Sequence, residues 1–250
     1  MILWRLRFIC YIVFEITEYT RLISVNIYLK IFSLCFTIFL ISCSEDDSAS
    51  RVTIGTSGNV LVLNDLQYQL PYVVQVTDEN GAPKQGVNVE LKVTPIAYNK
   101  GTYGIFSFFR SDGTTTLSLD FAINASCLSE DTNNNGILDT GEDINGNGML
   151  DPANTSIISP HPTETPTLLT RTHTLLTGES GYAYFALTYP KSEAFWSSAE
   201  LIATASDGPP GNTQSVSVVY PYSETDFSNL PSDTIFAGPY GSASVCTDPS

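Results

Sequence analysis

The stretch VVQVTDENGAPKQGVNVEL, residues 73–91, contains two apolar segments separated by a polar, turn-forming segment. Residues 87–91 alternate apolar and polar side chains, which is typical of a strand with one buried face. Asn80-Gly81, between the two apolar segments, is a strong turn signal. The stretch therefore predicts two strands with a turn between them.

The same kind of pattern continues on both sides of this stretch. Further strand-like runs occur at residues 59–63, 104–109, 114–123, 168–176, 199–205 and 215–220. Val, Thr, Tyr and Phe are abundant in them, as is typical of strands. No helical period of useful length follows Cys43. We therefore predict an all-β fold, an antiparallel β-sandwich over residues 52–220.

Two of these segments resemble a known family. Residues 73–91 are similar to the opening hairpin of bacterial Ig-like domains of the invasin/intimin type, in which a strand ending in Thr-Asp leads through Asn-Gly-x-Pro to a strand starting Gly-Val. The segment TGESGYAYFALT, residues 177–188, resembles the second signature of that family. The resemblance covers roughly residues 55–220 outside one acidic insertion, and it implies an Ig-like sandwich.

The acidic insertion, residues 128–155, contains the calcium-loop pattern D-x-[DN]-x-[DN]-G-x5-E. The pattern runs from Asp131 to Glu142 and restarts twelve residues later at Asp143. Its candidate ligands are carboxylates, amide oxygens and, at the seventh position of each loop, a backbone carbonyl. In chain order they are Asp131, Asn133, Asn135, Ile137, Asp139, Glu142, Asp143, Asn145, Asn147, Met149 and Asp151.

The two loops leave no room for the helices that flank an EF-hand loop, and they resemble thrombospondin type 3 repeats instead. We expect two structural calcium ions, because oxygen ligands of this kind select a hard cation. The first site should be the tighter one, since Asn154 stands at the twelfth position of the second loop where an acid is expected. The second should bind in the range of ~10⁻⁴–10⁻³ M. A disordered acidic loop is the alternative.

Residues 1–42 have the features of an export leader. Lys30 precedes an apolar run, and the segment 40–43, Leu-Ile-Ser-Cys, resembles the lipobox of bacterial lipoproteins. That resemblance implies lipidation of Cys43 and, with Ser44 following it, sorting to the outer membrane. Residues 43–51 form an acidic tether, and translation is expected to start near residue 29. The alternative is a membrane-spanning anchor, for which the run is short.

Cys127 and Cys246 are the two cysteines that remain after the leader and Cys43. In an oxidising compartment they leave one possible intramolecular disulfide. We expect this bridge to attach an irregular tail, residues 221–250, to the root of the insertion. The alternative is two unpaired thiols.

The net charge is −15, and 24 Asp and Glu stand against 7 Lys and Arg from Cys43 onward. Nucleic acid is not expected as a partner, because its backbone requires a basic surface. No common catalytic motif is present, and we do not expect an enzyme. The prediction is a structural or adhesive module of the bacterial envelope, facing the periplasm or the cell surface. The alternative is a binding subunit for carbohydrate or for an envelope or secretion-complex protein.

Overall fold

The computed structural model describes residues 50–153, 156–163, 171–207, 212–230 and 234–250. The predicted leader and its lipidation site Cys43 lie outside these ranges, as does nearly all of the tether at 43–51. Within them, no helix is long and apolar enough to cross a membrane.

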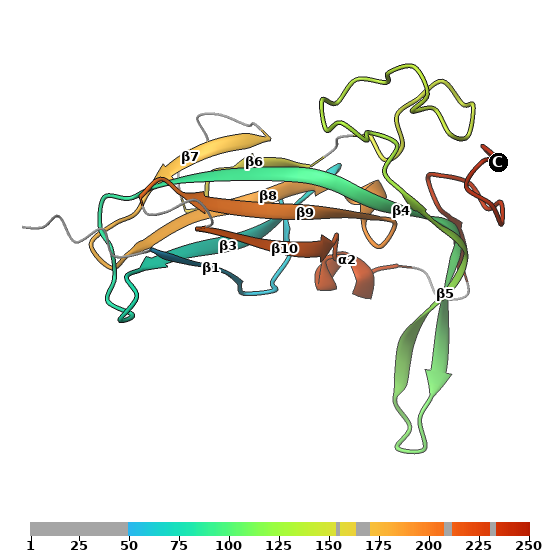
Figure 1. Ribbon diagram of the computed structural model, residues 1–250. Helices are drawn as coiled ribbons and strands as arrows, with labels where there is room; N and C mark the ends of the chain where they lie inside the picture. Colours follow the sequence, from blue (N-terminus) through green and yellow to red (C-terminus); the bar gives the residue numbers. More distant parts are fainter. Residues whose placement is uncertain (1–49, 154–155, 164–170, 208–211, 231–233) are drawn as a thin grey trace, which may run out of the picture. The chain divides into compact units, whose positions relative to one another are not determined.

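Two antiparallel sheets pack against each other in the described part of the chain, which confirms the predicted all-β sandwich (Figure 1). The five-stranded sheet contains β1 (Arg51–Thr56), β2 (Leu61–Val62), β3 (Gln67–Thr77), β6 (Ile157–Ser159) and β8 (Tyr182–Pro190). The six-stranded sheet contains β4 (Asn88–Phe109), β5 (Thr115–Leu128), β7 (Thr172–Leu176), β9 (Ser197–Ala205), β10 (Thr213–Val219) and β11 (Thr234–Ala237).

The strand order separates β3 from β4. In the first sheet β3 lies between β1 and β8, whereas β4 lies beside β9 in the second. The turn at Asn80-Gly81 does form, since the Asp78 N–H donates to the Ala82 carbonyl at 2.8 Å. The chain then crosses to the other sheet, so the hairpin that the family resemblance implied at residues 73–91 does not form. Each of the two strands has one apolar face, and these faces meet across the core rather than side by side.

The core follows the alternation that the sequence shows. Val89, Leu91 and Val93 on β4 are buried, while Glu90 and Lys92 between them are exposed. Burial of such side chains contributes roughly 25 cal/mol per Å² of apolar surface. The apolar sides of both sheets therefore hold the sandwich together.

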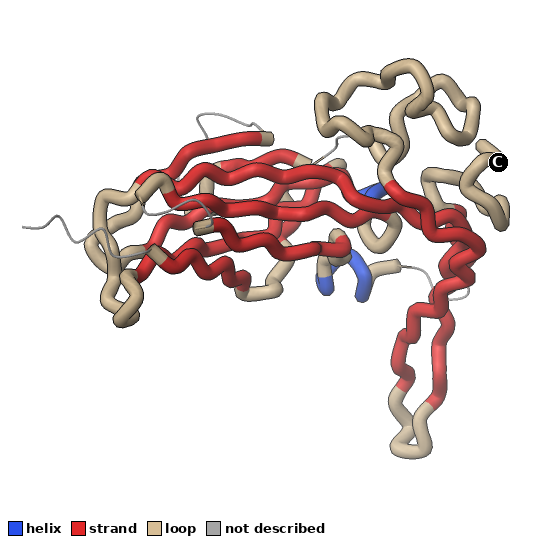
Figure 2. Tube along the Cα trace, in the orientation of Figure 1, coloured by secondary structure: helices blue, strands red, loops and turns tan. Residues whose placement is uncertain are grey.

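The long strand β4 pairs with different strands along its length. Its first part pairs with β9 as far as Tyr98, and its second part pairs with β5. The β4–β5 pairing begins at Ala97 and has a register shift between Lys100 and Gly101. Gly101 has φ 146°, and a Cβ there would lie 2.1 Å from the Ala122 carbonyl oxygen, so the close approach requires glycine. Residues Thr102–Ile105 of β4 also pair with β11 on their other edge, and beyond Ile105 β4 and β5 continue together as a two-stranded arm (Figure 2).

The segment after Tyr220, predicted to be an irregular tail, includes two regular elements among its described residues. It contains a short helix, α2 (Glu224–Ser228), and β11, which pairs with β4. Tyr189 donates from its hydroxyl to the Pro221 carbonyl at 2.7 Å and so attaches the start of this segment to β8.

Candidate metal centre

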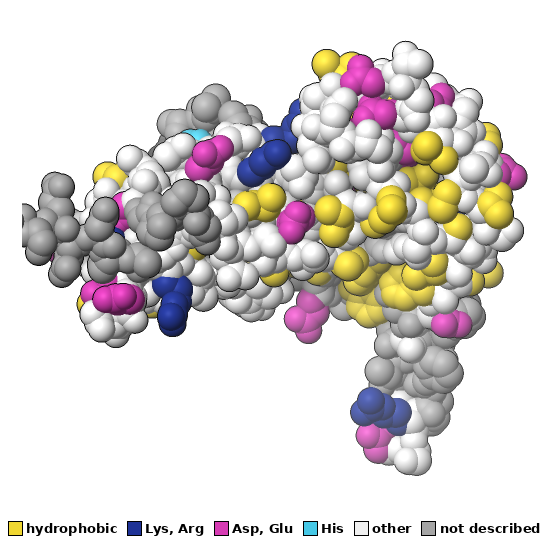
Figure 3. Space-filling view, in the orientation of Figure 1, with side chains coloured by type: hydrophobic (Ala, Val, Ile, Leu, Met, Phe, Trp, Pro, Cys, Tyr) yellow, Lys and Arg dark blue, Asp and Glu magenta, His cyan; other side chains and the backbone are white. Residues whose placement is uncertain are grey.

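The acidic insertion begins where β5 of the six-stranded sheet ends at Leu128, and it is followed by β6 of the five-stranded sheet. A disulfide between Cys127 and Cys246, with a Cα–Cα distance of 5.6 Å, lies at its root. The predicted pairing of these two cysteines is therefore confirmed. Acidic side chains are visible on the surface of the insertion (Figure 3), and its sequence contains no Lys or Arg.

The first loop is closed by the carboxylate of Asp131. Its Oδ1 accepts from the Asn135 N–H at 3.0 Å, and its Oδ2 accepts from the Gly136 N–H at 2.8 Å. Asn134 and Gly136 have φ values of 59° and 76°, so the fourth and sixth positions are both left-handed. This conformation explains the glycine at the sixth position.

The second loop repeats this backbone. Asp143 Oδ2 accepts from the Gly148 N–H at 3.0 Å, again a contact from the first to the sixth position. Gly146 and Gly148, at the fourth and sixth positions, have φ values of 73° and 74°. The two copies of the sequence pattern thus adopt the same conformation.

The ninth position of each loop is an aspartate whose carboxylate accepts hydrogen bonds from two asparagine side chains. Asp139 Oδ2 accepts from Asn133 Nδ2 at 2.8 Å and from Asn135 Nδ2 at 2.7 Å. In the second loop, Asp151 Oδ2 accepts from the side-chain amides of Asn145 and Asn147, both at 2.7 Å. The third, fifth and ninth positions therefore converge in both loops.

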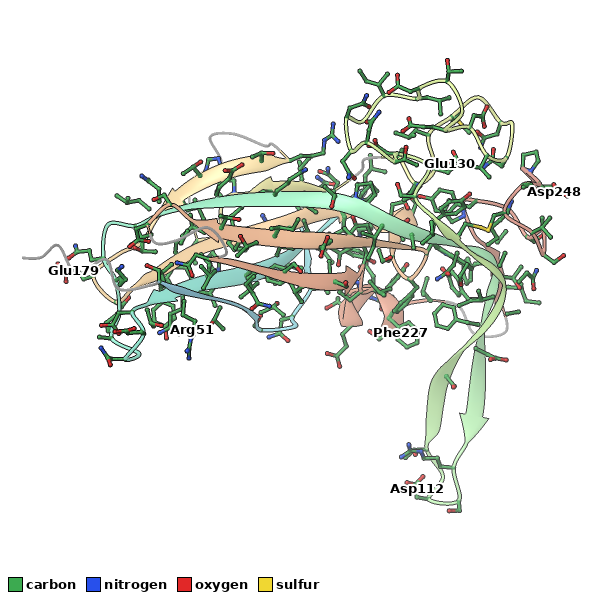
Figure 4. The ribbon with its side chains drawn as sticks, in the orientation of Figure 1. Arg51, Asp112, Glu130, Glu179, Phe227 and Asp248 are labelled. Carbon is green, nitrogen blue, oxygen red and sulfur yellow. A yellow bond between two sulfur atoms is a disulfide. The ribbon has the colours of Figure 1, made fainter. Side chains whose placement is uncertain are left out.

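Glu142 closes the first loop from its twelfth position. Its Oε1 accepts from the Thr132 N–H at 2.9 Å, and its Oε2 accepts from the Asp139 N–H at 3.0 Å. Asn154, its counterpart in the second loop, lies outside the described residues. A different acid, Glu130, lies at the base of the insertion (Figure 4) and donates its N–H to the Asp151 carbonyl at 2.8 Å. The sequence pattern does not include this residue.

In the insertion, polar side chains are buried and apolar ones are exposed, which is the reverse of the sandwich. The polar side chains Glu130, Asp131, Glu142, Asn145 and Asp151 are all buried. The apolar side chains at the seventh positions, Ile137 and Met149, are 64% and 61% exposed. Exposure of these two side chains is compatible with a role for their backbone carbonyls, which was the expectation.

The pKa values of the acids in the insertion are shifted in different directions, depending on the surroundings of each side chain. Burial raises the pKa of Glu130 above its ordinary value, although backbone N–H groups oppose this. Hydrogen bonds from Asn133 and Asn135 lower the pKa of Asp139, and the Asp139 backbone N–H with the Thr132 hydroxyl lowers that of Glu142. These hydrogen bonds favour the charged form of the last two carboxylates.

The donor set fits a hard cation. It consists of carboxylate, amide and carbonyl oxygens, which are the ligands of Ca²⁺. Asp143 Oδ1 is buried and has no hydrogen-bond partner among the described residues. In the same ranges no group of three or more His, Cys, Asp or Glu side chains lies together as a metal site. Oxygens of Asp139, Glu142 and Asp151 accept hydrogen bonds from N–H groups instead.

The insertion contacts the sandwich through both loops. In the first, the Arg171 guanidinium lies against Gly136, where an added Cβ would be 2.4 Å from Nη2. In the second, the Tyr98 side chain of β4 lies beside the Asn145 side chain. The loop pair is therefore packed on the end of the second sheet.

A pocket of about 410 Å³ lies elsewhere, between the sandwich and the tail. Aromatic rings line it, with Tyr103 stacked on Phe236 at 4.8 Å and tilted toward Trp196 at 5.7 Å. Tyr222, Lys191 and Ser192 also contribute. Such a lining combines apolar surface with a few polar groups, as small-molecule sites do.

Comparison with known proteins assigns no family. No protein-family model matches the chain, and neither does any curated protein. Among solved structures, the chain is similar to that of a DUF4466 family protein from Parabacteroides merdae ATCC 43184, with 12% sequence identity and a TM-score of 0.27. The match covers 71% of this chain and 46% of that one, so the chain spans about half the length of that protein.

Proposed function

We propose that this protein is a lipid-anchored, calcium-stabilised Ig-like β-sandwich of the bacterial cell envelope, with a structural or adhesive role. The observation that carries the proposal is the repeated geometry of the two loops. Each has left-handed backbone at the fourth and sixth positions and a ninth-position carboxylate that gathers two amides. The buried Oδ1 of Asp143, which has no hydrogen-bond partner among the described residues, supports it as well.

Calcium is the cation that suits these loops best. It accepts six to eight oxygen ligands in flexible geometry, whereas Mg²⁺ demands a near-ideal octahedron and retains water. Affinities of ~10⁻⁴–10⁻³ M, the range of extracellular modules, match the calcium that an exported protein meets. At such steady concentrations the ions act as structural supports rather than as a switch.

The export side of the proposal is supported by the lipobox-like segment at 40–43 and by the disulfide. A disulfide persists in oxidising compartments such as the periplasm or the cell surface. A sandwich fixed by calcium and a disulfide is suited to hold or present a surface there, and its chain contains no motif that assigns catalysis.

Calorimetric titration of the purified protein with calcium chloride tests the proposal. We expect about two ions per chain, with dissociation constants of ~10⁻⁴–10⁻³ M. A variant with Asp131→Asn and Asp143→Asn should lose most of the binding. The matched control, Asp65→Asn with Asp120→Asn, removes two exposed acids outside the insertion and should bind as the native chain does. Absence of heat and of calcium retention at about 5 mM would contradict the proposal.

A second experiment addresses the cellular role. Pull-down of the lipidated protein from its own membranes, with calcium and with chelator, should recover envelope partners that depend on calcium. If the same partners bind in chelator, the loop pair has no part in adhesion.

The second candidate function is that of a carbohydrate-binding subunit, and the aromatic pocket favours it. Tyr222 and Phe236 line the pocket with partly exposed rings beside the buried Tyr103 and Trp196, and Lys191 with Ser192 offers polar groups. A glycan array should then give binding that Tyr222→Ala abolishes. Tyr184→Ala is the control, since Tyr184 is exposed on β8 and does not line the pocket. No glycan binding by the native chain would remove this candidate.

A further inference from the structure

The second calcium loop lacks an acid where its sequence pattern requires one. Its twelfth position is Asn154, and its own carboxylates are Asp143 and Asp151. The first loop has Asp131, Asp139 and Glu142 in the corresponding places. By its sequence the second site is therefore one carboxylate short.

Glu142 defines what the twelfth-position acid does in the first loop. Its N–H donates to the Asp139 carbonyl at 3.1 Å. Its Oε1 accepts from the N–H of the second position, Thr132, and its Oε2 accepts from the N–H of the ninth position, Asp139. The side chain thus spans the loop from its start to its ninth residue.

Glu130 makes the same three contacts with the second loop. Its N–H donates to the Asp151 carbonyl at 2.8 Å, the ninth position. Its Oε1 accepts from the N–H of the second position, Ile144, at 3.1 Å. Its Oε2 accepts from the Asp151 N–H at 3.0 Å. Glu130 therefore occupies, in three dimensions, the place that Asn154 holds in the sequence pattern.

The charge around Glu130 supplies an independent indication of a cation. Glu130 is 1% exposed, and the buried Oδ1 of Asp143 has no hydrogen-bond partner among the described residues. The two salt bridges in the described ranges, Lys84–Asp207 and Lys191–Asp226, involve neither of them. Burying charged carboxylates without a counter-charge is costly, and a divalent cation bound at the second loop would offset that cost.

We propose that Glu130 is the missing acidic ligand of the second calcium loop, so that each loop uses the glutamate that directly precedes the other. Glu142 precedes Asp143 and serves the first loop, while Glu130 precedes Asp131 and serves the second. Both sites then have three carboxylates, and their affinities should be similar rather than unequal. This inference rests on the proposed binding of calcium.

Because each loop takes a glutamate ligand that precedes the other loop, the two sites are also coupled. Glu130 and Asp131 are neighbours in the chain but serve different ions, and so are Glu142 and Asp143. Ordering of one site therefore positions a ligand of the other. We expect the two ions to bind with positive cooperativity.

Calcium titration of Glu130→Gln, Glu142→Gln and Asn154→Ala tests the assignment. The native chain should bind about two ions. Each glutamine variant should retain about one ion at 1 mM calcium, having lost at least about tenfold in affinity at the other site. Asn154→Ala should bind as the native chain does.

The outcomes separate the two proposals. If the native chain binds no calcium, the calcium proposal itself fails. If the native chain binds two ions and Glu130→Gln still binds both with unchanged affinity, or if Asn154→Ala loses one, the role of Glu130 is overturned while calcium binding stands.

A structural role for Glu130 alone is distinguished by a second measurement. A purely structural residue would lower thermal stability equally with calcium and with chelator, whereas a ligand should lower the gain in stability that calcium confers. If Glu130→Gln does not fold, Glu130→Asp replaces it, keeping the charge while shortening the reach. In that variant, the calcium affinity of one site should fall at least about tenfold. Unchanged affinity at both sites would overturn the proposal.

Discussion

The sandwich and the acidic insertion are held together by opposite kinds of side chain. In the sandwich, Leu91, Leu187 and Leu201 are completely buried, and polar residues alternate with such positions toward solvent. In the insertion, acids such as Glu130 and Glu142 are buried, and Ile137 and Met149 face solvent.

This reversal shows which force stabilises each region. Apolar burial is non-directional and needs no ligand, so the sandwich should be stable without divalent ions. The insertion has many carboxylate-to-backbone hydrogen bonds, and its buried charges need compensation. It should therefore depend on calcium and on the disulfide at its root.

Removal of the disulfide should give the largest effect. A double variant, Cys127→Ala with Cys246→Ala, opens a loop with a sequence separation of 119 residues. The chain-entropy model assigns such a bridge about 5 kcal/mol. Urea unfolding of the variant and of the oxidised native chain measures the loss. An unchanged free energy of unfolding would show that the tail and the insertion are held by their other contacts.

A substitution that creates a cavity in the core should give the second-largest loss of stability. Leu201 on β9 is completely buried, and Leu201→Ala should cost about 2–5 kcal/mol because neighbouring side chains cannot fill the space. Leu176→Ala on β7, where the side chain is 63% exposed, is the matched control and should cost less than about 0.5 kcal/mol. Both losses should be the same in calcium and in chelator. A calcium-dependent loss at Leu201 would break the distinction between the two regions.

Calcium removal should have a smaller effect, confined to the insertion. A site with a dissociation constant of ~10⁻⁴ M at about 1 mM calcium contributes about 1.4 kcal/mol, from RT ln(1 + [L]/Kd). Hydrogen exchange should then show faster exchange at Gly136 and Gly148 in chelator, with Leu91 and Leu201 unchanged. Magnesium added to the chelated sample should restore little of the lost protection from hydrogen exchange. Equal loss of protection in both regions would contradict a separate, ion-dependent insertion.

The same comparison explains what the sequence could predict. The alternation in residues 87–91 and the strand-like composition of residues 199–205 are local properties of single segments, and both segments were predicted correctly as strands. The assignment of the Cys127–Cys246 bridge required only that two cysteines remained after the leader. The twelve-residue repeat located the two loops, because ligand spacing in one loop is also local.

The errors and omissions concern contacts between distant residues. The resemblance of residues 73–91 to a family hairpin was misleading, because alternation identifies a buried face but does not say what packs against it. The structure places β3 and β4 in opposite sheets. Glu130 was missed because its partner Asp151 is 21 residues away and outside any single loop pattern. β6, with three residues, was too short to carry a period.

The smallest effect is expected where the tail meets the sandwich through charge, at Lys191 and Asp226. Their atoms Nζ and Oδ2 are 2.5 Å apart, and Tyr68 donates to the same carboxylate at 2.9 Å. The Lys191 hydrogen bond, with that from Tyr68, lowers the pKa of Asp226 below its ordinary value of 3.8. Because both side chains remain partly exposed, Asp226→Asn should cost at most about 1 kcal/mol at pH 7.

The pH dependence of this contact has a definite sign. Since the folded pKa of Asp226 is lowered, its stabilisation is complete above the unfolded value of 3.8 and is lost as the pH falls through the lower folded value. The difference in unfolding free energy between the native chain and Asp226→Asn should therefore vanish only in strong acid. It should also be independent of calcium, since the contact lies outside the insertion. A difference that responds to calcium at pH 7 would mean that the ions stabilise the sandwich and the tail as well.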